Sequence, residues 1–375
     1  MNKPQNTFCN QIHRREFLRD LGGGFAALGL TSMLAQDGFF SSKAMAKELP
    51  KFVNPLAPKN PPLPGKAKSV IFLFMYGGPS HVDTFDHKPN LYPLDGKTID
   101  VKTFGRGGKR NKSRVVGPKW DFKPYGECGK MVSDLFPHVG SCVDDIAFLH
   151  SMTAESPIHG SAMLMMNAGN LLSGHPSLGS WVNYGLGSES EDLPGFVVLT
   201  SVGGRNPQPI ASRQWSAGFL PSRFQGVEFN STGDPVQYVR NPKGVSAEHQ
   251  KKLVNAITTL DRHRNQAIND PETDTRIAAY EMAFKMQTSV PELMDVSKEP
   301  QHILDMYGAK PGDGSYASNC LLARKLAEKG VRFIHLYHRG WDHHGGLEKY
   351  MDTCCGLTDK PTWALIQDLK QRGML

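Results

Sequence analysis

The chain has 375 residues, of which 39% are hydrophobic and 21% are charged. These proportions exclude an integral membrane bundle and a disordered chain, and the length suits one large α/β domain or two to three smaller ones. The 38 glycines and 26 prolines predict a loop-rich fold. The formal net charge is +7, but basic and aromatic residues do not interleave as they do on nucleic-acid-binding surfaces, so we expect no nucleic-acid partner.

Residues 1–46 contain the three parts of an export signal in the required order. Arg14 and Arg15 lie in a segment that resembles the twin-arginine motif, an apolar stretch follows, and Ala46 ends an Ala-x-Ala cleavage site. The apolar stretch is shorter than the about 20 residues that cross a bilayer, so we expect no stable membrane span. We predict that the twin-arginine translocase exports the protein, which is then periplasmic or secreted from the cell. The alternative is an amphipathic first helix that carries the arginine pair.

The mature chain divides into a linker and a domain. Residues 47–66 hold six prolines, which predicts an extended linker. Residues 67–375 alternate apolar runs with helical patterns, which predicts an α/β domain with a doubly wound, mostly parallel sheet and helices on both faces. Strands are predicted over 69–75, 146–149, 196–199 and 331–337, and helices over 130–143, after Pro157, over 246–306, 315–330, 348–351 and 361–369.

The first polar cluster follows the strand predicted over 69–75. His81, Asp83 and Asp86 lie within six residues at a strand end, where functional residues collect in parallel sheets. Mixed imidazole and carboxylate donors suit zinc, manganese or a similar divalent ion. The alternative is a turn whose aspartates cap a helix.

The second cluster follows the strand predicted over 331–337. Asp342 and His344 would share a side in extended backbone, whereas His343 would face elsewhere. Since parallel strand ends meet at one edge, we expect Asp83 and His344 to lie close together. The alternative is a histidine-rich turn.

The third cluster lies between the strand predicted over 146–149 and the helix after Pro157. His159 stands near the helix start, where backbone N–H groups could hold an anion, and Ser161 follows it. A structural role for His159 is the alternative. Residues 97–123 are basic and glycine-rich, which fits either a solvated loop or an anion-attracting rim. Cys128 and Cys142 could form a disulfide, which the sequence leaves open.

These motifs together resemble a secreted bacterial family, the domain of unknown function 1501, which is grouped with the alkaline phosphatase and sulfatase superfamily. The resemblance rests on the twin-arginine signal, on residues 75–86, 135–138 and 151–169, and on Gly340-Trp341-Asp342-His343-His344. It implies a doubly wound α/β core with a metal site at the strand ends. It supplies no known reaction.

The chain departs from the superfamily pattern at two points. His159 stands where a sulfatase nucleophile would open its helix, and Ser161 comes two residues late. Relatives continue beyond a helix like 363–369 with further metal ligands, so we expect the C-terminal part of the domain to be missing and the sheet edge there to be open.

Two functions remain open at this point. In the first, the chain is an exported metal-dependent hydrolase of sulfate or phosphate esters, with a small anionic ester or a sulfated glycan as substrate. The second is a non-catalytic binding protein on a sulfatase-like fold. For the first, the metal ligands would be Asp83, Asp342 and His344, with His81 and Asp86 as ligands or their supports. His159 would be a ligand or a catalytic acid or base, Ser161 a further catalytic candidate, and Arg332 or Arg339 would bind the anion. Zinc, calcium and manganese are not distinguished.

Overall fold

A computed structural model describes residues 56–102, 110–203, 210–236, 241, 244–268 and 271–375. The predicted signal peptide, with Arg14, Arg15 and Ala46, lies outside the described residues, as does the first half of the predicted linker. In the part of the chain that is described, no helix combines the length and the apolar character that a membrane crossing requires.

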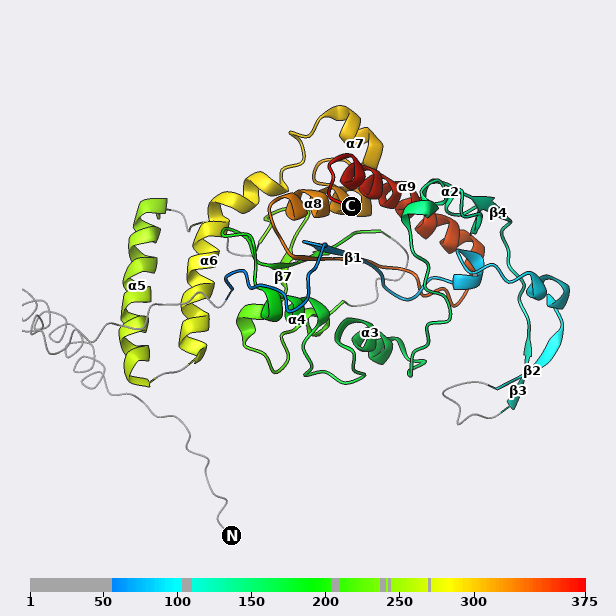
Figure 1. Ribbon diagram of the computed structural model, residues 1–375, viewed down its shortest axis with the longest axis horizontal. Coiled ribbons are helices and arrows are strands. Elements are labelled where there is room, and N and C mark those ends of the chain that lie inside the picture. The colour runs from blue at the N-terminus through cyan, green and yellow to red at the C-terminus, as the bar shows by residue number, and fades with distance from the viewer. Residues whose placement is uncertain (1–55, 103–109, 204–209, 237–240, 242–243, 269–270) are drawn as a thin grey trace, which may run out of the picture. The chain divides into compact units, whose positions relative to one another are not determined.

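A parallel sheet of four strands forms the centre of the domain (Figure 1). In spatial order the strands are β1 (Val70–Met75), β8 (Phe333–His338), β6 (Phe196–Thr200) and β7 (Val227–Phe229). All three pairings are parallel, so the four carboxyl ends point toward one edge of the sheet. Strand β8 is buried along its whole length and pairs with β1 on one side and β6 on the other.

Helices cover both faces of this sheet (Figure 1). On one face lie α8 (Tyr316–Glu328) and α9 (Leu347–Gln371), and on the other lie α3 (His159–Ala168) and α4 (Leu178–Leu186). The remaining helices and strands are α2 (Pro137–Gly140), α5 (Ala247–Ile268), α6 (Pro271–Met294), α7 (Gln301–Tyr307), β2 (Thr98–Lys102), β3 (Arg110–Arg114), β4 (Phe122–Tyr125) and β5 (Lys130–Ser133). Short 3₁₀ turns span His81–Asp83, Pro89–Leu94, Val143–Asp145, Ser212–Trp215 and Ser222–Phe224.

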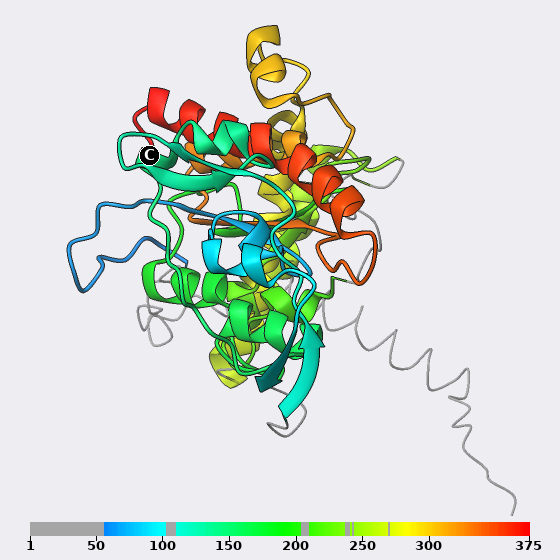
Figure 2. The same ribbon diagram turned by 90° about the vertical axis from the view of Figure 1, so that its right-hand side faces the viewer.

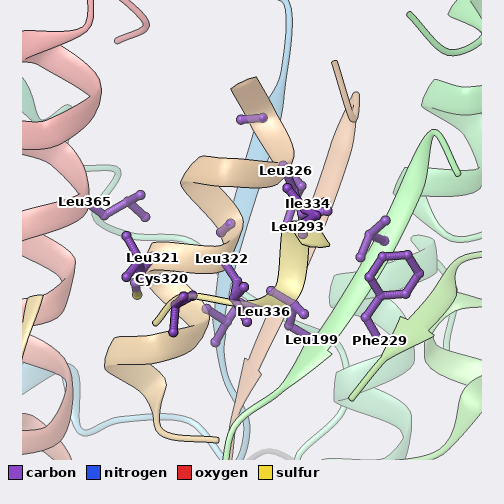
Figure 3. Packing of buried hydrophobic residues seen from close by; sticks show 14 of the residues in the cluster. Leu199, Phe229, Leu293, Cys320, Leu321, Leu322, Leu326, Ile334, Leu336 and Leu365 are labelled. Atoms are coloured by element: carbon purple, nitrogen blue, oxygen red, sulfur yellow. The ribbon is translucent and has the colours of Figure 1, made fainter. Parts of the chain in front are cut away.

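The alternation of side chains along the strands builds two cores. Ile334 and Leu336 of β8 point to the α8 face, where they join Leu321 and Leu326 (Figure 3). The intervening residues, such as Tyr337, point to the opposite face, toward α3 and α4. Apolar side chains therefore cover both faces of the sheet and pack against a helical layer on each side. The sequence predicts this burial from the continuous apolar runs of the strands.

A third cluster lies beside the sheet, where α2 and the β4–β5 hairpin pack against α9; Figure 2 shows α9 from the side. It buries Val132 of β5, Phe136, which directly precedes α2, and Met351 of α9. Trp341, which follows β8, is also buried in this cluster, with 2% of its surface exposed. The cluster therefore joins the helix layer to the loop that follows the central strand.

Several sequence predictions are wrong between residues 97 and 149. The segment predicted as a helix over 130–143 instead forms β5 and the short α2, because Lys130–Ser133 pairs with Phe122–Tyr125 in an antiparallel hairpin. Residues 146–149 are not a strand. The basic segment is not simply a loop, since β2 and β3 form a second antiparallel hairpin within it. Both hairpins depend on cross-strand partners, which a single apolar run does not reveal.

Other differences are smaller. The helical segment predicted to begin at 348–351 and to continue or restart over 361–369 is one continuous helix, α9, which contains Pro361. Helix α4 and strand β7 were not predicted from the sequence, and both are short. The cysteines at 128, 142, 320, 354 and 355 are all unpaired among the described residues, so the disulfide considered above is not formed.

A buried ionic network ties α8 to α7 and α9. Arg324 of α8 is 3% exposed, and its guanidinium lies 2.7 Å from carboxylate oxygens of Glu299 and of Glu328 and 3.0 Å from Asp368. Asp368 also accepts a hydrogen bond from the hydroxyl of Tyr307. Arg372 also pairs with Asp368 and Glu328, and Lys325 lies 3.6 Å from Glu299, so two further cations share these carboxylates, but only Arg324 contacts all three.

We predict that Arg324→Ala lowers the free energy of unfolding by about 3–5 kcal/mol, because it removes a buried guanidinium from Asp368 and Glu299, which keep only Arg372 and Lys325 as cationic partners. Urea denaturation followed by circular dichroism measures this loss. Arg262→Ala is the matched control, since its pair with Glu281 is exposed and should contribute about 1 kcal/mol or less. Equal losses in the two variants would contradict the structural role of the network.

Two buried imidazoles on β8 are held neutral. Burial lowers the pKa of His335 to about 3 and that of His338 to about 4. His335 stacks on Tyr337, with ring centroids 4.0 Å apart, and on Phe72 at 4.6 Å. The unfolded chain binds protons at these residues below about pH 6.5 while the folded chain does not, so acid favours unfolding.

We predict that stability falls as the pH drops from 6.5 toward 4, with each imidazole contributing up to about 1.4 kcal/mol per pH unit. His335→Phe should reduce this slope, because an apolar ring keeps the stacking and does not titrate. His302→Gln, an exposed position on α7, is the control and should leave the slope unchanged. Urea midpoints at pH 7 and pH 5 test this, and an unchanged slope in His335→Phe would overturn it.

Candidate functional site

The loops that follow β1 and β8 lie against each other at the carboxyl edge of the sheet. The backbone N–H of Tyr76 donates to the carbonyl of His338 at 2.7 Å, and that of Trp341 donates to the carbonyl of Tyr76 at 3.2 Å. Gly77 has a φ of 115°, and a Cβ atom there would lie 2.5 Å from the backbone nitrogen of Asp342. Only a residue without a side chain permits this approach.

Hydrogen bonds from side chains fix the second of these loops. The indole N–H of Trp341 donates to Nδ1 of His338 at 2.8 Å, which turns the chain back directly after the strand. The carbonyl of Gly340 lies 2.8 Å from Nε2 of His343 and accepts from Sγ of Cys354 at 3.4 Å. His343 therefore points at its own backbone, consistent with the expectation that it faces away from Asp342 and His344.

Three side chains converge next to this loop. Oδ1 of Asp342 lies 2.9 Å from Nε2 of His344 and 3.2 Å from Nε2 of His159, the first residue of α3. The ligand atoms of all three residues lie within 4.8 Å of one another. The side chain of Asp342 is 19% exposed, that of His159 is 43% exposed and that of His344 is 84% exposed. The carboxylate is thus held at the base of a group that opens to solvent.

The donor set and spacing fit a divalent metal ion. Ligands about 2.0–2.1 Å from a tetrahedral ion stand about 3.3 Å apart, close to the two distances from Asp342. Two imidazoles and one carboxylate suit zinc, manganese or iron better than calcium, which prefers oxygen ligands. His159, Asp342 and His344 are the described residues that combine these donors at such spacing.

Positive charge lies at the same edge of the sheet. Arg339 directly follows β8, and its Nε atom is buried without a hydrogen-bond partner among the described residues. Burial raises the pKa of Tyr76, and the positive charges of Arg213 and Arg339 oppose that rise, so both guanidinium groups lie close enough to act on this phenol. Arg213, from the 3₁₀ turn over 212–215, was not predicted from the sequence because that segment has no motif.

Asp83 has a different environment from the one predicted. Its buried carboxylate accepts hydrogen bonds from the hydroxyl of Ser80 at 2.6 Å and from the backbone N–H of Lys119 at 3.1 Å. It does not belong to the group formed by His159, Asp342 and His344. These contacts give Asp83 a role in fixing the turn after β1.

His81 and Asp86 belong to a separate polar cluster. Asp86 lies 2.9 Å from the ammonium of Lys88, 3.8 Å from His81 and 3.7 Å from His150. The hydrogen bond from Lys88 is the main cause of a lowered pKa at Asp86. A lysine thus already pairs with this carboxylate, and neither His81 nor Asp86 belongs to the group formed by His159, Asp342 and His344.

Two further assignments are corrected by position. Arg332 precedes β8, at the opposite end of the strand from Asp342, and its guanidinium donates to the carbonyl of Gly187 and pairs with Glu189. It braces the amino edge of the sheet and does not line this site. Ser161 follows His159 by two positions in α3, which rotates its side chain by about 200° around the helix, away from the direction of His159.

The fold and the site together define a mixed α/β protein with a His–Asp–His group at the carboxyl edge of a parallel sheet. A family model described as "Protein of unknown function (DUF1501)" matches residues 67–375, and the chain belongs to this family. The match starts just before β1 and includes all three residues of the group. No curated protein and no solved structure matches the chain.

We predict that Gly77→Ala destabilises the protein by about 1–3 kcal/mol more than Gly78→Ala does, because only the first methyl group meets the backbone of Trp341 and Asp342. Both glycines have positive φ and both variants carry backbone strain, but nothing lies within 4 Å of a Cβ at Gly78. Urea denaturation of the two variants measures the difference. Equal stabilities would show that the two loops do not meet at Gly77.

Proposed function

We propose that this chain is an exported, metal-dependent hydrolase of sulfate or phosphate esters with a sulfatase-like fold. The observation that supports this most is the spacing of His159, Asp342 and His344 at the carboxyl edge of the sheet. A divalent ion bound there would polarise an ester oxygen and make a bound water a better nucleophile at neutral pH. Export rests on the twin-arginine pattern around Arg14 and Arg15.

The residues of the chain have distinct roles in this proposal. Asp342 supplies the anionic ligand. Because Gly77 and Trp341 fix its loop, Asp342 would need little rearrangement when a metal ion binds. His159 and His344 approach it from two different elements and leave the solvent side open for substrate. An imidazole that is not engaged by the ion could carry a proton to or from the leaving group.

Arg339 and Arg213 supply the attraction for an anionic substrate. Guanidinium groups bind sulfate and phosphate oxygens through paired, charge-assisted hydrogen bonds. The buried Nε of Arg339 has no hydrogen-bond partner among the described residues, so a substrate oxygen within reach would remove the cost of that unmet donor. This argument favours an anionic ester over a neutral one.

Metal binding and turnover test this function on the full chain. Isothermal titration with Zn²⁺, Mn²⁺ and Ca²⁺ should show one ion bound, with Zn²⁺ or Mn²⁺ tighter than Ca²⁺. Asp342→Asn and His344→Ala should each weaken binding at least about tenfold, since each removes one of three ligands. His249→Ala, an exposed histidine on α5, is the matched control.

Turnover is then measured on p-nitrophenyl sulfate and p-nitrophenyl phosphate with the metal-loaded protein. We expect hydrolysis that Asp342→Asn abolishes, and a higher KM in Arg339→Gln. Metal binding that depends on Asp342 without turnover of any ester would favour the second candidate, a non-catalytic binding protein. The position of Ser161 two residues after His159 in α3 favours this candidate, because helix geometry turns its hydroxyl away from His159 and leaves the described start of α3 without a hydroxyl nucleophile beside it.

A further inference from the structure

A cavity lies at the opposite edge of the sheet from the His–Asp–His group. It has a volume of about 260 Å³, and its lining includes Gly195, which directly precedes β6, and Val227, which begins β7. Asn183 of α4, Arg223 of the 3₁₀ turn over 222–224 and Met282 of α6 also line it. It therefore forms where the amino ends of two strands meet three other elements.

Two polar atoms in this lining have unmet hydrogen-bonding capacity. Oδ1 of Asn183 and Nε of Arg223 are buried and have no hydrogen-bond partner among the described residues. Asn183 is only 2% exposed, so its amide has little access to bulk water. A buried polar group without a partner costs about 1–3 kcal/mol, which a bound ligand with complementary groups would recover.

Close contacts at Gly195 and at Arg223 shape the cavity. A Cβ atom at Gly195 would collide with the amide oxygen of Asn183, so the glycine lets the amide lie against the strand start. The guanidinium of Arg223 lies over the ring of Phe224, with 5.7 Å between Cζ and the ring centroid, which restricts its orientation. The structure therefore leaves room for the amide of Asn183 beside Gly195 and places the guanidinium of Arg223 against an aromatic ring.

The charge and polarity of the lining define the ligand class. Among the described residues that line the cavity, Arg223 is the charged one and none carries a carboxylate. The rest of the wall is mostly apolar, with Leu56, Pro194, Val227, Ala279, Met282 and Met286. A single guanidinium favours a monoanion, and methionine side chains adapt to an aliphatic body. The acceptor on Asn183 needs a neutral donor, because an ammonium group would be repelled by Arg223.

We propose that this cavity binds small aliphatic hydroxycarboxylates. The carboxylate pairs with Arg223, the hydroxyl donates to Oδ1 of Asn183, and the aliphatic chain lies against Met282 and Met286. The site is separate from the His–Asp–His group, since it lies at the amino ends of β6 and β7. It does not depend on the function proposed for the other edge.

Isothermal titration of the full chain with three probes tests the proposed ligand class. Two of the probes each differ from the first by one group, the hydroxyl or the carboxylate. The three probes are 2-hydroxyhexanoate, hexanoate and 1,2-hexanediol. We expect 2-hydroxyhexanoate to bind about fivefold or more tighter than hexanoate, and the diol to bind at least about tenfold more weakly than 2-hydroxyhexanoate. Absence of binding by 2-hydroxyhexanoate at about 10 mM would overturn the proposal.

Two variants separate the two polar contacts. Arg223→Gln should weaken both acids about tenfold, whereas Arg114→Gln, on the exposed β3, removes the same charge elsewhere and should leave both affinities unchanged. Asn183→Leu should remove the preference for the hydroxyl while hexanoate still binds. Binding of 2-hydroxyhexanoate that neither variant weakens would place the ligand elsewhere and overturn the assignment, and circular dichroism confirms that each variant is folded.

Discussion

The contact between Gly77 and the backbone of Trp341 and Asp342 is the constraint on which the candidate site depends. It brings the ends of β1 and β8 together although Gly77 and Trp341 stand 264 positions apart in the sequence. Any side chain at position 77 would separate the two loops or shift Asp342. Since Asp342 is the residue that both His159 and His344 approach, its backbone position sets the geometry of the whole group.

The layers of the fold support this contact from both sides. Strand β8 is buried along its length between the α8 and α4 faces, so its end cannot move without disturbing both cores. Trp341 anchors the following loop in the cluster around α9, and α3 delivers His159 from the other face. Three regions far apart in the sequence thus meet at one sheet edge, and the exposed His344 leaves the group accessible from solvent.

The sequence predicted the elements whose signals are local. The apolar runs of β1, β6 and β8 and the helical patterns of α3 and α8 are each contained in one segment, and Asp342 and His344 were selected from a single loop. The β2–β3 and β4–β5 hairpins depend on cross-strand pairing, which one segment does not show. Asp83 was predicted as a ligand, and Asp86 as a ligand or its support, from their position after a strand, whereas Ser80, Lys119 and Lys88 engage them in the fold. Arg213 was missed because its segment contains no recognisable motif.

We propose that His159, Asp342 and His344 bind one divalent ion. Anomalous diffraction from crystals grown with Zn²⁺ or Mn²⁺, recorded at the absorption edge of the metal, locates such an ion without reference to activity. We expect one strong peak about 2.0–2.2 Å from Nε2 of His159, Oδ1 of Asp342 and Nε2 of His344. A peak at Asp83 or Asp86 instead, or no peak at saturating metal, would contradict it.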